Sequence, residues 1–132
     1  MKTAKDIMAP AVISVSPETP FHEAIELLVE NRVSGLPVVD DSDRLVGIIS
    51  EADRLRLISN PEQLKNRPVS EFMTCGVITV DEQASLNQIA DLLMRVGIRR
   101  LPVVNNGRVV GIVSRGDLVR ALHEGPDPVA AV

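Results

Sequence analysis

Apolar residues along the chain recur with two different spacings, and both spacings occur in each half. A spacing of three to four residues, typical of a helix with one buried face, covers Phe21–Val29 and again Leu86–Met94. Thr19 is predicted to cap the first of these helices, with Pro20 at its first position. Ser85 stands just before the second helix. The pattern therefore predicts two amphipathic helices in corresponding places.

Short runs of β-branched residues surround each helix and predict strands. One strand precedes each helix, around Ile13–Val15 and Ile78–Val80, and two strands follow it before a closing helix. Asn106 and Gly107 join the last two strands of the second half, and both tolerate the positive φ of a hairpin turn. The remaining predicted strands and helices are Pro37–Asp40, Leu45–Ser50 and Glu51–Ile58, then Pro102–Val104, Arg108–Ser114 and Arg115–His123. Each half thus has the order β-α-β-β-α, which predicts an α+β fold with mixed sheets packed against helices.

The two halves repeat one sequence pattern. A shift of 65 residues places residues 12–15 on 77–80 and residues 36–39 on 101–104, and after the first hairpin the shift becomes 64. Since the period is long and occurs only twice, it predicts a pseudo-twofold module rather than a solenoid. The predicted parts are a first repeat over 1–64, with a linker at Ser59–Pro68, a second repeat over 65–123, and a disordered tail over 124–132.

The composition indicates a soluble protein with an aliphatic core. Of the 132 residues, 42 are Ile, Leu or Val and only two are aromatic, which excludes a base-binding pocket between two aromatic rings. The net charge of −4 and the pI near 5.1 disfavour nucleic-acid binding, because that needs a basic surface. No apolar run is long enough for a membrane span, and the single cysteine, Cys75, cannot form an intramolecular disulfide. We therefore expect a cytoplasmic protein that binds neither nucleic acid nor membrane.

One motif stands at the start of the closing helix in both halves and carries the most specific chemistry. It consists of glycine, two apolar residues, serine, two further residues and aspartate, as in Gly47–Asp53 and Gly111–Asp117. Glycine within a β-branched strand lets another group approach the backbone closely. The serine begins a helix, where free N–H groups favour an anionic oxygen, and the aspartate can accept two hydroxyl hydrogens, as from a ribose diol. The same Ser-x-x-Asp spacing is also a capping box that needs no ligand, and the two interpretations are compatible.

The repeat and its motifs resemble the cystathionine β-synthase (CBS) domain family. The resemblance rests on the β-α-β-β-α order, a methionine ahead of the first strand, the phrase Leu-Pro-Val-Val and the Gly-to-Asp motif, each present twice. It covers about residues 4–123 and implies a stand-alone tandem pair, called a Bateman module, whose repeats pack with pseudo-twofold symmetry around two clefts. Such modules usually bind adenosine-containing ligands and commonly form homodimers through their helices, so we expect both properties.

The resemblance also implies which residues bind the ligand. Asp53 and Asp117 would bind ribose, with Ser50 and Ser114 near ribose or phosphate. The strand starts would hydrogen-bond the adenine edge through their backbone, and aliphatic side chains would form its walls; the residues concerned are Ile13, Val15, Ile78 and Val80, with Met8 and Met73. The walls would come from Ile13, Ile78, Met8 and Met73. The alternative is that these four are ordinary core residues, since methionine fills gaps in any core.

The halves differ where a phosphate would lie. Arg99 and Arg100 precede Leu-Pro in the second half, whereas Ser34 and Gly35 stand there in the first. Arginine offers planar, bidentate donors to phosphate, and adjacent residues of an extended segment point opposite ways, so only one arginine needs to face the ligand. Further candidates, each more typical of a solvated charge, are Arg32, Arg115 and Arg120. We predict two unequal sites, with phosphate bound through Arg99 or Arg100.

These features favour a regulatory module for energy sensing that binds AMP, ADP or ATP, with Mg²⁺ as an accompanying ion. Two alternatives stay open: an interaction and dimerisation module with vestigial clefts, favoured by Ser34 and Gly35, and a sensor of S-adenosylmethionine or NAD(H). The sequence has no nucleophile–base pair and no zinc-ligand spacing, so we predict neither an enzyme nor an obligatory cofactor. The output would then pass to an effector protein or to the protein's own oligomer.

Overall fold

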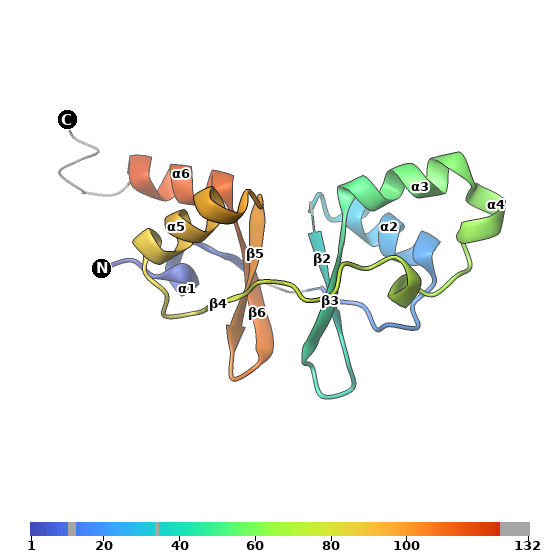
Figure 1. The fold of residues 1–132 in the computed structure, drawn as a ribbon, viewed down its shortest axis with the longest axis horizontal. Helices are drawn as coiled ribbons and strands as arrows, with labels where there is room; N and C mark the ends of the chain where they lie inside the picture. The colour runs from blue at the N-terminus through green and yellow to red at the C-terminus, as the bar shows by residue number, and fades with distance from the viewer. Residues whose placement is uncertain (11–12, 34, 125–132) are drawn as a thin grey trace. The chain divides into compact units, whose positions relative to one another are not determined.

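The computed structural model describes residues 1–10, 13–33 and 35–124, which form two compact units (Figure 1). Of the described residues, unit 1 contains 1–10, 78–106 and 110–124, and unit 2 contains 13–33, 35–77 and 107–109. The units differ from the sequential halves 1–64 and 65–123, because the N-terminal segment packs with the second half. Strands and helices both occur in each unit, so the chain is a mixed α+β protein.

Unit 1 contains a four-stranded sheet in the order β1-β6-β5-β4. Its strands are β1 (Ala9–Pro10), β4 (Val80–Asp81), β5 (Arg100–Asn105) and β6 (Arg108–Ser114). β1 pairs antiparallel with β6, and β4 pairs parallel with β5, where Val80 lies opposite Val103. Asn106 and Gly107 connect β5 to β6 with φ of 54° and 81°, which confirms the predicted hairpin turn. The sheet thus joins three separate segments of the chain.

The described helices of unit 1 are α1 (Ala4–Ile7), α5 (Leu86–Val96) and α6 (Arg115–Glu124), and Figure 1 shows α5 beside α6. Ser85 caps α5, because its hydroxyl accepts a hydrogen bond from Gln88 N at 3.2 Å. The Gln88 side chain accepts one from Ser85 N at 2.8 Å in return. The buried core of unit 1 consists of Ala4, Val80, Ile89, Leu93, Leu101, Val103, Val113 and Leu118.

Unit 2 repeats this plan around a two-stranded sheet of β2 (Gly35–Val39) and β3 (Leu45–Ser50). Single bridges extend it on both sides: Val15 pairs parallel with Val38, and Thr74 pairs antiparallel with Ile48. The helical segments are α2 (Phe21–Glu30), the 3-10 turn η1 (Glu51–Asp53), α3 (Arg54–Ser59), α4 (Pro61–Leu64) and the 3-10 turn η2 (Val69–Glu71). The buried core of unit 2 consists of Val15, Phe21, Ala24, Ile25, Leu28, Leu36, Val38, Ile49 and Val69.

A short helical turn docks in each unit through an equivalent backbone hydrogen bond. In unit 1, the N–H of Ala4 in α1 donates to the carbonyl of Ala84 at 2.9 Å. In unit 2, the N–H of Val69 in η2 donates to the carbonyl of Thr19, also at 2.9 Å. Ala4 and Val69 lie 65 positions apart in the sequence, and so do Thr19 and Ala84. The repeat therefore extends beyond the strands to the segments that carry Met8 and Met73.

Two predictions about the start of α2 are wrong. Thr19 does not cap α2, since its hydroxyl accepts a hydrogen bond from Ser16 N at 3.1 Å and the helix begins at Phe21. Pro20 is extended, with ψ of 140°, and therefore lies before the helix rather than in its first position. The closing helix of the first half, predicted as Glu51–Ile58, begins as the 3-10 turn η1 and becomes α-helical only at Arg54.

The short first strands and the linker also differ from prediction. Only Val15 of the predicted strand Ile13–Val15 exchanges backbone hydrogen bonds with β2, and β4 begins at Val80. The predicted linker Ser59–Pro68 contains α4, and its Lys65 and Arg67 carbonyls accept hydrogen bonds from the first turn of α2. The predictions for Val12, Ser34 and residues 125–132 lie outside the described residues.

Candidate ligand-binding site

The second Gly-to-Asp motif lies in unit 1, where β6 ends and α6 begins. Ser114 is the last residue of β6, and its backbone N donates to Asp117 Oδ2 at 2.9 Å. Asp117 N donates in return to Ser114 Oγ at 3.2 Å. These reciprocal bonds form a capping box, so the capping interpretation is confirmed. The Asp117 side chain is 14% exposed, and its cap uses Oδ2, which leaves Oδ1 for another partner.

Several arginines of unit 1 lie along this motif. The Arg99 carbonyl accepts a hydrogen bond from Arg115 N at 2.9 Å, which places the residue before β5 next to the first residue of α6. Arg100 begins β5, is half-buried, and has a buried Nε atom. Arg120 in α6 donates through Nη2 to Asp117 Oδ1. The charged group of Arg120 therefore lies on the oriented carboxylate, and the backbones of Arg99 and Arg115 meet at the start of the same helix.

The first motif, in unit 2, has a similar backbone cap and different neighbours. Ser50 N donates to Asp53 Oδ2 at 2.8 Å, and Ser50 Oγ lies 3.5 Å from the same oxygen. Asp53 is 8% exposed, which makes it the buried charged residue of the part of the chain that the structure describes. The arginine three residues after Asp53 is Arg56, whose guanidinium carbon lies 6.0 Å from the centre of the Phe72 ring. The two motifs thus share their capping geometry but not their charge environment.

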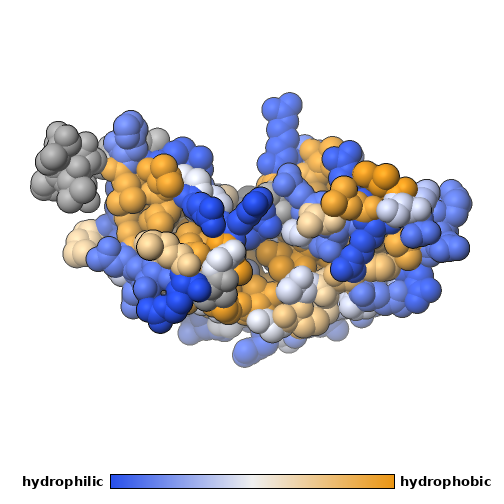
Figure 2. Space-filling view, turned by 45° about the horizontal axis from the view of Figure 1, so that its top comes forward, coloured by the Kyte–Doolittle hydropathy of each residue, from blue (hydrophilic) through white to orange (hydrophobic). Residues whose placement is uncertain are grey.

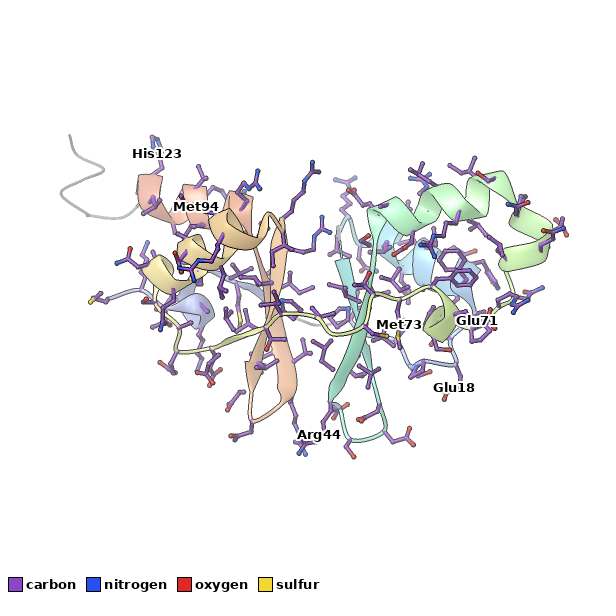
Figure 3. The ribbon with its side chains drawn as sticks, in the orientation of Figure 1. Glu18, Arg44, Glu71, Met73, Met94 and His123 are labelled. Atoms are coloured by element: carbon purple, nitrogen blue, oxygen red, sulfur yellow. The ribbon has the colours of Figure 1, made fainter. Side chains whose placement is uncertain are left out.

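The glycine of each motif makes room for a methionine of the same unit. A Cβ atom at Gly47 would lie 2.6 Å from the sulfur of Met73, which lies beside β3 (Figure 3). A Cβ atom at Gly111 would lie 2.8 Å from Met8 Cγ and 2.7 Å from the Ala9 carbonyl oxygen. The expected close approach to the backbone is therefore confirmed, and the approaching group is a methionine side chain. Both methionines are half-buried and pack against the core of their unit.

The predicted adenine-contacting residues divide into core and surface positions. Val15 and Val80, expected to contact the base through their backbone, are each 6% exposed and have side chains in the buried cores. Ile13 is half-buried against the core of unit 2. Ile78 is 40% exposed and is the member of this set that offers a free apolar surface. Backbone contacts of these segments with a base remain a prediction.

The structure brings Ser114, Asp117, Arg99 and Arg115 together, and it brings Ser50 together with Asp53. Arg120, which the sequence offers as a phosphate candidate more typical of a solvated charge, has a side chain that is 64% exposed, as a solvated charge would. Its pairing with Asp117 was not predicted. The signal was available: the two residues lie three positions apart on a predicted helix, where side chains are neighbours. No corresponding signal distinguishes Arg56 from Arg120, since both have the same spacing from their aspartate.

Comparison with protein families matches the CBS domain twice, over residues 4–60 and 69–124. The chain belongs to the CBS domain family. Both Gly-to-Asp motifs lie inside the matched residues, one in each CBS domain. Two domains in tandem therefore account for the internal repeat, and the sequence-based assignment to a CBS pair is confirmed.

Three similar proteins show how far the likeness extends. CBSX1, a chloroplastic CBS domain-containing protein of Arabidopsis thaliana, is 36% identical over 135 residues, which cover 81% of this chain and 57% of CBSX1. The crystal structure of CBSX2 from the same plant in complex with AMP is 39% identical, with a TM-score of 0.79, and the match covers 92% of this chain and 96% of that one. The CBS domain pair of MJ0100, in complex with 5′-methylthioadenosine and S-adenosyl-L-methionine, is 30% identical, with a TM-score of 0.79 and coverage of 91% and 94%. This chain thus spans little more than half the length of CBSX1.

Metal ligands and membrane-spanning helices can be assessed over residues 1–10, 13–33 and 35–124. Within these ranges, histidine, cysteine, aspartate and glutamate side chains do not gather in threes as ligands of a metal ion would. None of the described helices has both the length and the apolarity needed to cross a membrane.

Proposed function

We propose that this CBS pair is a regulatory module that binds an adenine nucleotide at its Ser-x-x-Asp motifs. AMP, ADP and ATP are the ligands we favour, and Mg²⁺ would accompany the di- and triphosphates. In this proposal Asp53 and Asp117 accept hydrogen bonds from ribose hydroxyls. Arg99 or Arg100 binds the phosphate at the Asp117 motif. Backbone groups near Ile78 and Ile13 contact the base.

The observation that carries the proposal is the Asp117 carboxylate, which Ser114 N holds at 2.9 Å and which pairs with Arg120. The Arg99 carbonyl accepts a hydrogen bond from Arg115 N at the start of the same helix. A carboxylate accepts hydrogen bonds and binds no anion itself, whereas neighbouring arginines bind phosphate through paired N–H donors. Together they match a ligand with hydroxyl groups at one end and phosphate at the other. A nucleoside monophosphate has both features.

Two solved relatives support an adenosine-containing ligand. CBSX2 was crystallised in complex with AMP, and the MJ0100 pair in complex with 5′-methylthioadenosine and S-adenosyl-L-methionine. The arginines of unit 1 favour the AMP type here, because the sulfonium of S-adenosylmethionine is positive and like charges repel. We therefore place S-adenosylmethionine and NAD(H) second.

Binding, rather than catalysis, is the activity we propose. A ligand regulates such a module only through unequal affinity for two of its states, and the output passes to an effector protein or to the oligomer. The exposed thiol of Cys75 suits a reducing compartment, so the cytoplasm stays our proposed location, although the relative CBSX1 is chloroplastic.

We also propose that the protein forms a homodimer through its helices. Each unit exposes large apolar residues on its helices, and Figure 2 shows this apolar surface. In unit 2 they line a groove of about 530 Å³ between α2 and α3, where Leu55 is 65% and Ile58 67% exposed. In unit 1 the exposed residues are Met94 (Figure 3), Val119 and Leu122. Exposed apolar surface of this kind is typical of an interface.

The ligand proposal is tested by thermal melting with AMP, ADP, ATP, S-adenosylmethionine and NADH. A ligand at about 100 times its dissociation constant adds about 2.7 kcal/mol of stability, which raises the midpoint by roughly 3–5 °C per kcal/mol for a chain of this size. We expect the wild type to shift with a nucleotide and the Asp53→Asn/Asp117→Asn variant to lose the shift. Asparagine retains the helix cap, and Asp41→Asn at an exposed turn is the matched control.

The interaction-module alternative is favoured by Gly35, which stands where the second repeat has Arg100. If the melting midpoint is unchanged by every ligand at millimolar concentration while light scattering still gives a dimer, that alternative replaces the sensor. The dimer itself is tested by Leu55→Glu/Ile58→Glu, which we expect to yield monomers. Gln63→Glu on α4 adds a similar charge away from the apolar face and should leave the dimer intact.

A further inference from the structure

The two aspartates differ in whether their second carboxylate oxygen has a partner. Both use Oδ2 for the cap, toward Ser114 N in unit 1 and Ser50 N in unit 2. Asp117 Oδ1 also accepts a hydrogen bond from Arg120 Nη2. Within the described part of the chain, Asp53 Oδ1 receives no such bond. A ribose hydroxyl would therefore find one oxygen free at Asp53 and both oxygens bonded at Asp117.

Arg120 lies across its own motif. A Cβ atom at Gly116 would lie 3.4 Å from Arg120 Nη1 and 3.7 Å from Ser114 Oγ. The guanidinium thus packs over the first turn of α6, on the side where Ser114 and Asp117 present their polar atoms. Because the Arg120 side chain is 64% exposed, its ion pair is weak and can be displaced.

The equivalent arginine in unit 2 has a different partner. Arg56 lies 64 positions before Arg120, but its guanidinium lies over the Phe72 ring at 6.0 Å, within the range of a cation–π contact. Phe72 is in turn fixed by stacking on Phe21, with ring centres 4.3 Å apart. The counterpart of Phe72 in unit 1 is Ile7, which has no ring. Unit 1 thus has no aromatic ring at the position that contacts Arg56 in unit 2.

We propose that Arg120 is a specificity-determining residue that competes with ligand hydroxyls for Asp117, whereas Phe72 holds Arg56 away from Asp53. This inference rests on the proposed nucleotide-binding function. It adds a difference in affinity for ribose hydroxyls to the difference in phosphate-binding arginines between the two sites. The Asp53 motif accepts ribose hydroxyls directly. At the Asp117 motif, ribose hydroxyls must compete with Arg120 for the lone pairs of Oδ1.

Adenosine is the probe for this competition, because it carries the hydroxyls without a phosphate that Arg120 could bind. An Asp53→Asn background leaves the Asp117 motif as the site to be measured. In this background we expect Arg120→Met to raise adenosine affinity about two- to fivefold, which corresponds to the free energy of an exposed ion pair. In an Asp117→Asn background, Arg56→Met should leave adenosine affinity unchanged. Affinities would be measured by NMR titration.

Phe72→Ile supplies the converse test in the Asp117→Asn background. Released from the ring, Arg56 is expected to pair with Asp53 and lower adenosine affinity about two- to fivefold. The additional change Arg56→Met should restore the affinity, which a general loss of packing would not allow. A failure of Arg56→Met to restore it would overturn the role of Phe72.

A ligand-free measurement distinguishes this inference from the proposed function. A double-mutant cycle would measure how strongly each pair is coupled in the unfolding equilibrium. We expect the unfolding equilibrium constant to show a coupling of about two- to fivefold between Arg120 and Asp117 and none between Arg56 and Asp53. If the wild type binds no AMP, the proposed function fails, and the cycle still reports on the ion pair. If AMP binds but Arg120→Met leaves adenosine affinity unchanged, lowers it or gives no adenosine binding, the competition is overturned.

Discussion

Gly47→Ala and Gly111→Ala place the same methyl group at equivalent positions of the two repeats. We expect the two variants to lose different amounts of folding stability. At Gly47 the new Cβ would meet the sulfur of Met73 at 2.6 Å and its Cγ at 2.7 Å. At Gly111 it would meet Met8 Cγ at 2.8 Å and also the carbonyl oxygen of Ala9 at 2.7 Å. A methionine side chain can rotate away, whereas the Ala9 carbonyl belongs to the β1–β6 pairing and cannot.

The magnitudes follow from these contacts. Overpacking a core costs about 1–3 kcal/mol, and replacing glycine by alanine returns about 0.4–1 kcal/mol through the unfolded chain. We expect Gly47→Ala to lower stability by about 1 kcal/mol and Gly111→Ala by about 2–3 kcal/mol. With roughly 3–5 °C per kcal/mol, the melting midpoints should differ by several degrees.

Urea unfolding of single and double variants provides the assay. Met73→Ala should remove most of the cost of Gly47→Ala, so the double variant would be less destabilised than the sum of the single variants. Met8→Ala should remove only part of the cost of Gly111→Ala, because the Ala9 carbonyl stays in place. An equal or smaller cost for Gly111→Ala, or additive behaviour of Gly47→Ala with Met73→Ala, would refute the reasoning.

Three further predictions concern the fold. Ser85→Ala should lower the free energy of unfolding by about 1 kcal/mol, because it removes the cap of α5. Thr19→Ala should lower it less, since Thr19 caps no helix, and chemical denaturation would compare the two variants. Phe21→Ala removes a fully buried ring and should cost about 3–5 kcal/mol by the same assay. Arg67, which hydrogen-bonds Glu71 at 2.6 Å, holds the pKa of Glu71 below its ordinary value of 4.5. This pair therefore stabilises the fold above pH 4.5 and loses its effect as the pH falls through the lowered pKa, so the difference in melting midpoint between wild type and Glu71→Gln should shrink in acid.

Elements with local signals were predicted well from the sequence. The strands Leu45–Ser50 and Arg108–Ser114 have the predicted bounds, because β-branched runs end there at a serine that begins a helix. The turn at Asn106 follows from its tolerance of positive φ. The short turns α1 and η2 were missed, since their docking depends on hydrogen bonds between distant residues, such as Ala4 with Ala84. Such pairings have no local sequence pattern.

The candidate site shows the same division. The Ser-x-x-Asp spacing correctly indicated a capping box, because its bonds join residues three apart. The spacing of three residues made Asp117 a possible partner of Arg120. Arg56 has the same spacing from Asp53, so the different partners of the two arginines could not be predicted. Arg56 lies over the ring of Phe72, a contact that the packing of unit 2 creates and that we propose as the cause of the difference.

The central claim is that the motif aspartates bind ribose hydroxyls, and titration calorimetry with AMP and 2′-deoxy-AMP tests it most directly. A hydroxyl bonded to a carboxylate contributes about 1.5–3 kcal/mol, so the wild type should bind AMP at least about tenfold more tightly than 2′-deoxy-AMP. The Asp53→Asn/Asp117→Asn variant should lose that preference, while Asp41→Asn keeps it. Equal affinity of the wild type for both nucleotides, or a preference that survives in the double variant, would contradict the account.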